Sequence, residues 1–355
     1  MHISDRDLGS AIADRLRDAT ARDTPLRLAG GDTKRFYGRA VPGETLDLRD
    51  HAGVVNYDPA ELVLTARCGT RLADIETLLA GHGQRLGFDP PRHGVGATIG
   101  GATAAGLAGP SRQRHGAVRD HLQGVRMLTG DGRALRFGGE VLKNVAGYDV
   151  SRLMAGSLGI LGVLLELSLR VLPQPAAELT LVFETGAASA RDRLGSWSGT
   201  SLPLAASTWV AGCLYARFEG TDATLAAVRR QQGGEVLADA TSFWSKVRDH
   251  THPFFAAGAR LWRLHVPADA RLPLLEDAAL LEWQGVQRWY HDCEGRDFRA
   301  IAAEACGSAT LFRGAMGEEE VFAPLPAPVL RLHRSLKQVF DPAGILNRGR
   351  MYCGL

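Results

Sequence analysis

Gly94-Val95-Gly96-Ala97-Thr98-Ile99-Gly100-Gly101-Ala102-Thr103-Ala104-Ala105-Gly106 is a run of almost uniformly small side chains. Such a run makes a poor hydrophobic core, because cores are filled by bulky, closely packed groups. It suits a place where a flat, bulky ligand lies against the backbone, since glycine allows close approach to the main chain. The alternative is a glycine- and alanine-rich loop beside a helix contact.

Two further glycine-rich stretches lie on either side of this run in the sequence. The first is Gly30-Gly31-Asp32-Thr33-Lys34, which follows a strand predicted at Leu26–Leu28. Its backbone N–H groups, with a hydroxyl and a lysine charge beside them, suit a pyrophosphate. The other is Gly156-Ser157-Leu158-Gly159-Ile160-Leu161-Gly162-Val163, which leads into a long buried strand predicted from Gly162 to Leu172. The alternatives are an ordinary turn for the first and a helix end with a bulge for the second.

None of these stretches has the spacing of the common nucleotide-binding motifs. A Rossmann unit needs G-x-G-x-x-G between a strand and a helix, and an acidic residue after the next strand. A P-loop needs G-x-x-x-x-G-K followed by serine or threonine. The sequence contains neither, so the predicted phosphate site is of another kind.

The length and composition indicate two α+β domains. The chain has 355 residues, more than one ordinary core holds. Residues 1–173 contain 26 of the 42 glycines, whereas all six tryptophans lie beyond residue 196. This difference in composition indicates two domains with different functions. We place the boundary at Pro173-Gln174-Pro175, because proline interrupts helices and central strands. This gives a first domain at 1–173, a second at 174–325, and a terminal helix and tail at 326–355 that return to the first.

The second domain is predicted as a small antiparallel sheet with helices on one face. Its strand candidates are Trp209–Phe218, Leu261–Val266 and Trp283–Tyr290, and its helix candidates are Thr221–Gln231 and Asp297–Cys306. A terminal helix is expected at Leu325–Phe340. In the first domain, Val125–Leu128 and Ala134–Phe137 flank an Asp-Gly turn and predict a hairpin.

Charge, cysteines and apolar runs exclude several classes of protein. A net charge of +2 argues against a nucleic-acid partner, which requires a concentrated basic face. The five scattered cysteines argue against zinc and iron–sulfur sites. His250-Thr251-His252 lacks the carboxylates and glycines that surround the histidines of a metal-binding motif, so we expect surface histidines and no metal. The longest apolar run, Gly159–Leu165, is too short for a transmembrane segment, and no apolar signal core follows Met1. We expect a cytoplasmic protein.

Five motifs in order resemble one known superfamily. They are Ala97–Gly101, His115-Gly116-Ala117-Val118-Arg119-Asp120, Lys143-Asn144-Val145-Ala146-Gly147-Tyr148-Asp149, Gly156–Val163, and Phe340-Asp341-Pro342-Ala343-Gly344-Ile345-Leu346-Asn347-Arg348-Gly349-Arg350. Together they resemble the vanillyl-alcohol oxidase and para-cresol methylhydroxylase superfamily of FAD-binding proteins, and within it the E subunits of bacterial glycolate oxidases. The resemblance is dense over residues 25–172 and thinner over 200–350.

The resemblance implies a two-domain PCMH-type FAD-binding α+β fold with a smaller α+β cap. It puts the FAD pyrophosphate on Gly30–Lys34 and Thr98–Gly101, and the flavin ring near Gly156–Val163. Lys143, Asn144 and Tyr148 would shape the flavin pocket, with a loop that docks the domain as the alternative. Arg119 and Asp120 would line the pocket, with an ordinary ion pair as the alternative. The implied cofactor-binding positions are Gly30, Gly31, Asp32, Thr33, Lys34, Gly96, Thr98, Ile99, Gly100, Gly101, Gly106, Arg119, Asp120, Gly156, Gly159, Ile160, Gly162 and Val163.

Two departures from relatives refine this expectation. The position that carries a covalently bound flavin in some members through a histidine is Asp32 or Thr33 here, so FAD should be non-covalent. The metal-binding H-x-G-D-G-N-x-H motif of related 2-hydroxy-acid dehydrogenases is absent. No catalytic base can be assigned. We predict that Gly100→Trp prevents flavin retention while leaving the chain able to fold.

The implied function is that of an FAD-binding subunit in a glycolate-oxidase-type complex that converts a 2-hydroxy acid, such as glycolate to glyoxylate. Its partners would be a sister flavin subunit that carries the metal and a subunit with iron–sulfur clusters, which receive the electrons. Association with the inner face of the membrane would be peripheral, through these partners. The alternatives are a self-sufficient flavin enzyme, either a 2-hydroxy-acid dehydrogenase or an NADPH-dependent sugar-nucleotide reductase, and a structural subunit without redox activity.

Overall fold

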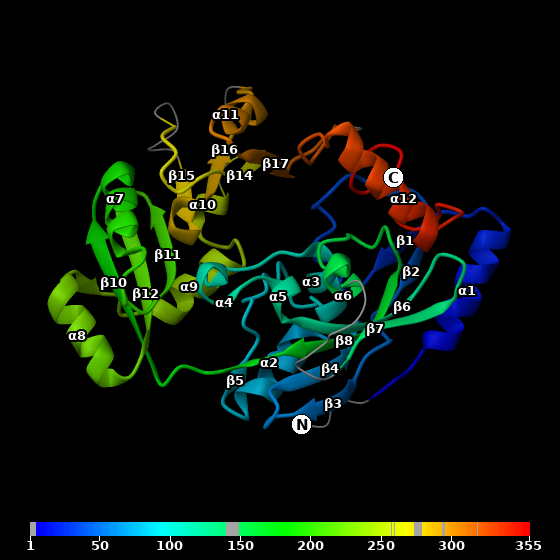
Figure 1. Ribbon diagram of the computed structural model, residues 1–355, viewed down its shortest axis with the longest axis horizontal. Coiled ribbons are helices and arrows are strands. Elements are labelled where there is room, and N and C mark those ends of the chain that lie inside the picture. Colours follow the sequence, from blue (N-terminus) through cyan, green and yellow to red (C-terminus); the bar gives the residue numbers. More distant parts are fainter. Residues whose placement is uncertain are drawn as a thin grey trace.

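Two β-sheets dominate the computed structural model, which describes residues 5–139, 149–256, 258, 260–272, 279–292, 295–317 and 319–355 (Figure 1). Lys143, Asn144 and Tyr148, which the sequence assigned to the flavin pocket, lie outside the described residues. No helix within these ranges is long and apolar enough to cross a membrane.

The first half contains a five-stranded antiparallel sheet of order β3-β4-β8-β6-β7 and two smaller strand pairs. Its elements are α1 (Gly9–Ala21), β1 (Leu26–Ala29), β2 (Glu44–Asp47), β3 (Val54–Asp58), β4 (Val63–Arg67), α2 (Leu72–Ala80), β5 (Gln84–Arg85), α3 (Ile99–Ala105), α4 (Arg112–His115), α5 (Val118–His121), β6 (Leu122–Leu128), β7 (Ala134–Gly138), α6 (Val150–Met154), β8 (Val163–Arg170) and β9 (Leu172–Pro173). Strand β8 is buried from Val163 to Leu169 because it lies at the centre of the sheet. The predicted hairpin is confirmed as β6 and β7.

The second half forms one eight-stranded antiparallel sheet of order β13-β10-β12-β11-β15-β16-β14-β17. Its elements are β10 (Ala177–Glu184), α7 (Ala187–Trp197), β11 (Leu204–Val210), β12 (Cys213–Gly220), α8 (Asp222–Gln232), β13 (Glu235–Val236), α9 (Ala240–Arg248), α10 (Pro253–Ala256), β14 (Leu261–His265), β15 (Ala279–Glu282), the 3-10 helix η2 (Trp283–Gly285), β16 (Gln287–His291), α11 (Phe298–Glu304), β17 (Ser308–Arg313) and α12 (Ala327–Phe340). The change from one sheet to the other occurs between β9 and β10.

The expectation of a small second sheet is wrong, because two segments predicted as single strands each contain a reversal. Trp209–Phe218 spans the end of β11, a turn at Ala211-Gly212, and most of β12. Trp283–Tyr290 begins with η2 and enters β16 only at Gln287. Ala211, Trp283 and Gln284 adopt positive φ angles that non-glycine residues rarely adopt, so the sequence carried little turn signal.

Alternating residues give the eight-stranded sheet two different faces. Trp262, Leu281, Tyr290 and Leu311 pack into a core shared with α7, α8 and α11. Their neighbours Leu261, Leu280, Trp289 and Phe312 pack on the other side, with Tyr37, Leu107 and Leu158 from the first half. This is the period-two alternation of a β-strand. The second face of the cap sheet therefore rests on the first domain.

Charged groups also join the two domains. Glu219 on β12 accepts hydrogen bonds from Arg85 at 2.6 Å and from His115 at 2.9 Å, both on the first domain. Burial raises the pKa of Glu219, but the hydrogen bonds from His115 and Arg85 outweigh this and lower the pKa to about 2. The ionised carboxylate is therefore held by its partners across the junction.

Acid should loosen this junction. A carboxyl whose folded pKa lies below its unfolded pKa adds stability above the unfolded value, and that stability falls away as the pH drops toward the folded value. For Glu219 the window runs from about pH 4.5 down to about pH 2. We expect Glu219→Gln to lower the free energy of unfolding by about 2 kcal/mol at pH 7. Between pH 4.5 and pH 2 the free energy of unfolding of this variant should fall less than that of the parent. Denaturant unfolding at several pH values measures both. Glu178→Gln, at a more exposed carboxylate near the same arginine, is the control and should differ little.

The C-terminal segment returns to the start of the chain. Figure 1 shows α12 and the tail (red) beside β1 and β2 (blue). The amide of Leu26 donates to the Ile345 carbonyl, and the amide of Asn347 donates to the Leu26 carbonyl. The tail thus pairs in parallel with β1 and completes that side of the first domain.

Candidate functional site

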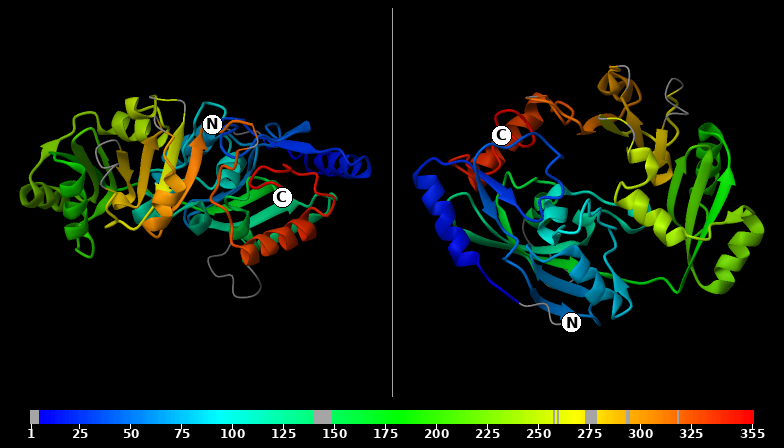
Figure 2. Two further views of the ribbon diagram at one scale, coloured as in Figure 1. Left: turned by 90° about the horizontal axis from the view of Figure 1, so that it is seen from above. Right: turned by 180° about the vertical axis from the view of Figure 1, so that it is seen from behind.

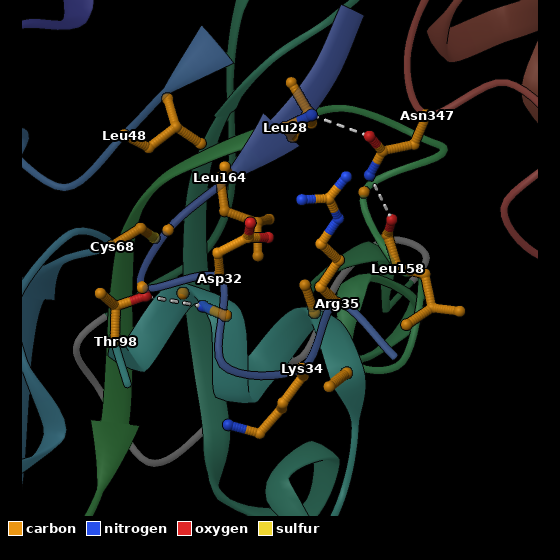
Figure 3. Close-up of a pocket in the computed structure, with 18 of the residues that line it drawn as sticks. Leu28, Asp32, Lys34, Arg35, Leu48, Cys68, Thr98, Leu158, Leu164 and Asn347 are labelled. Carbon is orange, nitrogen blue, oxygen red and sulfur yellow. Dashed lines mark hydrogen bonds between the residues drawn. The ribbon is translucent and has the colours of Figure 1, made fainter. Parts of the chain in front are cut away.

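A cavity lies where three glycine-rich segments and the tail meet. One wall is Arg27–Arg35, in β1 and the loop after it, and a second is the α3 region between Thr98 and Ala105. A third consists of Leu158, Gly159, Gly162 and Leu164, at and just before the start of β8, and Asn347 and Arg350 close the cavity. Figure 3 shows Leu28, Asp32, Thr98, Leu158, Leu164 and Asn347 around the opening.

The glycines bring the segments together. A Cβ on Gly31 would lie 1.6 Å from the Gly96 carbonyl oxygen, and one on Gly30 would lie 2.5 Å from the Thr98 hydroxyl. A Cβ on Gly100 would lie 2.5 Å from the Cys68 Cβ. These positions need glycine because protein atoms already lie where a Cβ would stand, and not only because a ligand is near. The expectation that Gly100→Trp leaves the chain able to fold is therefore wrong.

The loop from Gly30 to Lys34 presents a row of backbone donors. Within the described ranges, none of the five amides from Gly30 to Lys34 donates a hydrogen bond to another residue. Asp32 adopts a φ of +53°, which turns the chain into a concave loop. Successive N–H groups in such a loop form an anion-binding concavity.

The amides in the first turn of α3, unlike those of the Gly30–Lys34 loop, already donate hydrogen bonds within the protein. The amide of Ile99 donates to the Thr70 carbonyl, that of Gly100 to the Cys68 carbonyl, and that of Gly101 to the Thr98 hydroxyl at 3.2 Å. These donors are already used within the protein. The segment from Thr98 to Ala105 therefore forms a flat wall of the cavity, whereas the open donors belong to the Gly30–Lys34 loop.

Cations outnumber anions around the cavity. Arg27 pairs with Asp32 at 2.8 Å, and the Arg35 side chain extends between Asp32 and Asn347 (Figure 3). Arg350 donates to the carbonyls of Lys34, Arg35 and Arg39, and burial lowers its pKa to about 10, so it stays charged at neutral pH. The site therefore favours an anionic group.

Lys34 lines the cavity but directs its amino group elsewhere. Its Nζ donates to the Arg92 carbonyl at 3.3 Å and points away from Asp32 in Figure 3. Burial lowers the pKa of Lys34 to about 8, although the charge of Asp249 opposes this. Its charge therefore lies at the side of the cavity that faces the cap.

The Asn347 side chain forms hydrogen bonds with two of the segments that line the cavity. Its Oδ1 accepts from the Leu28 amide at 2.8 Å, and its Nδ2 donates to the Leu158 carbonyl at 2.6 Å. Next to it, Lys337 of α12 is buried and donates to the carbonyls of Ile160 and Leu346 and to Asp341. The sequence placed Asn347 and Arg350 in a matching motif but gave them no role, and it did not single out Arg27, Arg35, Cys68 or Leu164.

Ten of the eighteen predicted positions line the cavity, and eight do not. Ile99, Ile160 and Val163 direct their side chains into the hydrophobic core, and Gly96 lies behind Gly31. Gly106 and Gly156 meet where the end of α3 packs on the segment before β8. Arg119 and Asp120 lie on α5 with exposed side chains, and Asp120 accepts from the Ala117 amide at 2.8 Å. Asp120 thus caps its own short helix.

Histidines and acids in the described part of the chain give no metal centre. Among the described residues, no group of three histidines, cysteines or acids lies close enough to hold a metal ion. The expectation of surface histidines at 250 and 252 is wrong for His250, whose ring stacks on Phe255 at 4.0 Å and contacts Trp289 and Phe312. Burial lowers the pKa of His250 well below its ordinary value, which keeps the ring neutral.

The comparisons with known proteins agree with this geometry. A family model described as an FAD binding domain matches residues 10–138. The glycolate oxidase subunit GlcE of Escherichia coli is 45% identical over 350 residues, which are 98% of this chain and 99% of that protein. The glycolate oxidase subunit GlcD of Bacillus subtilis is 30% identical over 129 residues, 36% of this chain and 27% of that protein.

Solved structures share the fold at low identity. An alkyldihydroxyacetonephosphate synthase has a TM-score of 0.68 and 17% identity, with 95% of this chain and 75% of that one covered. The two-domain fold expected from the resemblance is confirmed. Because it is 45% identical to the Escherichia coli protein over nearly the full length of both, this chain belongs to the glycolate oxidase GlcE family of FAD-binding proteins.

Proposed function

We propose that this chain is the FAD-binding subunit of a glycolate-oxidase-type complex, which oxidises a 2-hydroxy acid and passes the electrons to partner subunits. The 45% identity to the Escherichia coli subunit over nearly the whole chain supports this proposal. The observation in the chain itself that carries it is the row of five open amides beside a cavity rich in cations.

The cavity fits FAD. The amides from Gly30 to Lys34 would hold the pyrophosphate, and Arg35 would neutralise part of its charge. The flat wall formed by Gly100, Gly101 and Ala104 leaves room for a planar ring, with Leu158 and Leu164 supplying apolar contacts. When bound, FAD supplies the hydride acceptor. Contact with FAD stays a prediction for the eight positions outside the cavity lining, which are Gly96, Ile99, Gly106, Arg119, Asp120, Gly156, Ile160 and Val163.

We propose that the flavin is held without a covalent bond. Among the described residues that line the cavity, Cys68 is the only histidine or cysteine. Burial raises the pKa of the Cys68 thiol well above its ordinary value, which removes the reactive thiolate. Asp32 and Thr33, at the position of the linking histidine in some relatives, offer no such nucleophile.

We propose that turnover needs partners. The only carboxylate among the described cavity-lining residues, Asp32, is paired with Arg27, which leaves no evident proton acceptor for a hydroxy acid. A sister flavin subunit with a metal would oxidise the substrate, and an iron–sulfur subunit would accept the electrons. The complex would lie in the cytoplasm at the inner face of the membrane. Residues 1–173 would hold FAD, 174–325 would form the cap, and 326–355 would close the cavity.

Visible absorption of the purified chain tests this function. A flavin band that moves to the supernatant on acid precipitation supports non-covalent FAD. Anaerobic glycolate should leave the band unchanged for the chain alone and bleach it once the partner subunits are added. Bleaching without partners would make this chain a catalyst by itself. A colourless chain that cannot be reconstituted with FAD would overturn the proposal.

Arg35→Ala should weaken FAD binding about 10- to 100-fold, because one charge-assisted contact to phosphate contributes about 1.5–3 kcal/mol. Isothermal titration of the apoprotein with FAD measures the change, and its dependence on salt should become shallower. Arg22→Ala removes an exposed arginine of a local ion pair at the end of α1 and should bind FAD like the parent. Equal affinity for the Arg35 variant would contradict the role of this guanidinium.

A further inference from the structure

Two arginines at the junction of the domains are left without a carboxylate partner in the described part of the chain. Arg112 on α4 and Arg263 on β14 are half-buried, and neither forms an ion pair within the described ranges. Other arginines of the junction do pair with carboxylates, as in Arg85–Glu219, Arg92–Glu76 and Arg248–Asp249. Because a charge without a partner is costly to bury, Arg112 and Arg263 stand apart from these structural pairs.

The Arg263 guanidinium reaches from the cap to the first domain. Its Nη2 donates to the Tyr37 hydroxyl at 2.9 Å, and its Cζ lies 5.5 Å from the ring centre of Tyr37 and 5.4 Å from that of Phe312. Its Nε is buried and has no hydrogen-bond partner. The aromatic rings thus hold the cation in place and leave part of its hydrogen-bonding capacity unused.

Arg112 reaches the same region from the first domain. Helix α4 lies against β11 and η2 of the cap, and Figure 2 shows this cyan part of the first domain on the side that faces the cap. The Arg112 guanidinium lies 4.5 Å from the ring centre of Trp283, and His265 stacks on the same ring at 5.4 Å. Burial, and then the charges of Arg263 and Arg112, lower the pKa of His265 to about 4, although its hydrogen bond with Gln287 opposes this. Both arginines therefore act on one small region, in which His265 is neutral.

The register of the cap sheet places two further polar groups in this region. Leu280 on β15 packs on the first domain, so Glu282, two residues later, faces the same way. Thr208 on β11 is opposite Glu282 and shares its face. Thr208 is completely buried, and its hydroxyl has no hydrogen-bond partner. The region thus contains an unused hydroxyl as well as an unused guanidinium nitrogen.

Glu282 does not neutralise the two arginines. Its Oε2 accepts from Trp289 at 2.6 Å and from Gln287 at 2.9 Å. Burial raises the pKa of Glu282 to about 7, although these two hydrogen bonds and the charge of Arg263 oppose this. At neutral pH about half of the Glu282 carboxyls are therefore protonated. The region keeps a net positive charge, which favours a small anion.

We propose that Arg263 and Arg112 bind the carboxylate of a short 2-hydroxy or 2-oxo acid between the cap and the first domain. A planar guanidinium is suited to a carboxylate, which it can hold through two parallel hydrogen bonds. The side chains themselves select a short carboxylate, and the restriction to these two acids rests on the proposed function, whose substrate and product they are.

This site is separate from the cavity assigned to FAD but lies close to it. Arg112, Arg263 and Glu282 do not line that cavity. Leu158 does line it, and Leu158 packs in the same cluster as Tyr37 and Trp289. The subunit would therefore hold the substrate or product of the complex beside its own flavin.

The test is isothermal titration of the full, FAD-loaded chain with glycolate and with glyoxylate. The parent should bind at least one of them, and the tighter of the two identifies substrate or product as the occupant. Arg263→Met should weaken this binding about 10- to 100-fold and Arg112→Met about 10-fold, because each removes a charge-assisted contact. The matched control is Arg230→Met, at an exposed arginine of α8 in the cap, and it should bind like the parent.

Stability separates a binding role from a structural one. Arg263→Met should keep its FAD, and its Tm should not fall, because the change replaces an unpaired charge with an apolar side chain. Arg263→Lys keeps the charge and should retain part of the affinity. A lower Tm of Arg263→Met together with parent-like binding of both acids would make Arg263 a structural residue and refute the site.

The remaining outcomes distinguish this site from the proposed function. A parent that keeps FAD but binds neither acid would overturn the site and leave the proposed function standing. A colourless chain whose binding of glycolate still depends on Arg263 would do the reverse. Inorganic phosphate that binds at Arg263 more tightly than either acid would show that the site does not select a carboxylate.

Discussion

Gly101→Trp should give a chain that folds normally and retains no FAD. Gly101 lines the cavity, and a Cβ there would meet only the Thr98 hydroxyl, at 3.2 Å. The indole would therefore extend into the space that we assign to the cofactor. We expect FAD affinity to fall more than about 100-fold. Flavin absorbance per mole of protein and titration of the apoprotein with FAD measure this.

The matched control is Gly195→Trp on α7. Gly195 is also a helical glycine, and a Cβ there would meet no atom within 4 Å. This variant should keep its FAD, and both variants should melt close to the parent apoprotein. A Gly101→Trp chain that keeps a full complement of flavin would show that the cofactor lies elsewhere.

Lys337→Met should be among the most destabilising single changes in the chain. Lys337 Nζ contacts the Asp341 carboxylate at 2.6 Å, and the Asp341 side chain is completely buried. Without the lysine this carboxylate is left as a buried, uncompensated charge, and loss of one partner of such a pair costs about 3–5 kcal/mol. The carbonyls of Ile160 and Leu346 lose a donor as well. We expect a fall of roughly 5 °C in Tm, measured by calorimetry on the FAD-free protein.

A double variant separates the charge from the packing. Lys337→Met with Asp341→Asn removes both charges. The amides of Ile345 and Leu346 donate to separate oxygens of Asp341, and the asparagine oxygen can still accept from one of them. The double variant should therefore be more stable than Lys337→Met alone, which gives a favourable coupling in the double-mutant cycle. A double variant that is less stable than either single variant would contradict the charge argument.

Local patterns predicted the elements around the cavity well. The glycine runs marked three of its walls, and the hairpin of β6 and β7 followed from its Asp-Gly turn. The fold class and the FAD cofactor are confirmed, whereas contact of individual residues with FAD stays a prediction. The turn at Ala211-Gly212 was missed because alanine at positive φ gives no warning, unlike the usual Asn-Gly.

Contacts between distant residues could not be predicted in this way. Asn347 meets Leu28 across 319 residues of sequence, and no local pattern shows which loops an asparagine will join. The same holds for Arg35, which the sequence left among many arginines, and for Arg119 and Asp120, whose motif marks a short helix and not the cavity wall.

The closure of the cavity by Asn347 imposes an order in time on the making of the protein. At about 5–20 residues per second, translation reaches Asn347 roughly 15–65 s after Leu28, so the loop after β1 waits that long for its partner. A chain that is still being synthesised has an incomplete site, and cofactor loading must follow the end of translation. A truncated chain that ends before Asn347 would lack bound FAD, and this would distinguish it from the full-length protein.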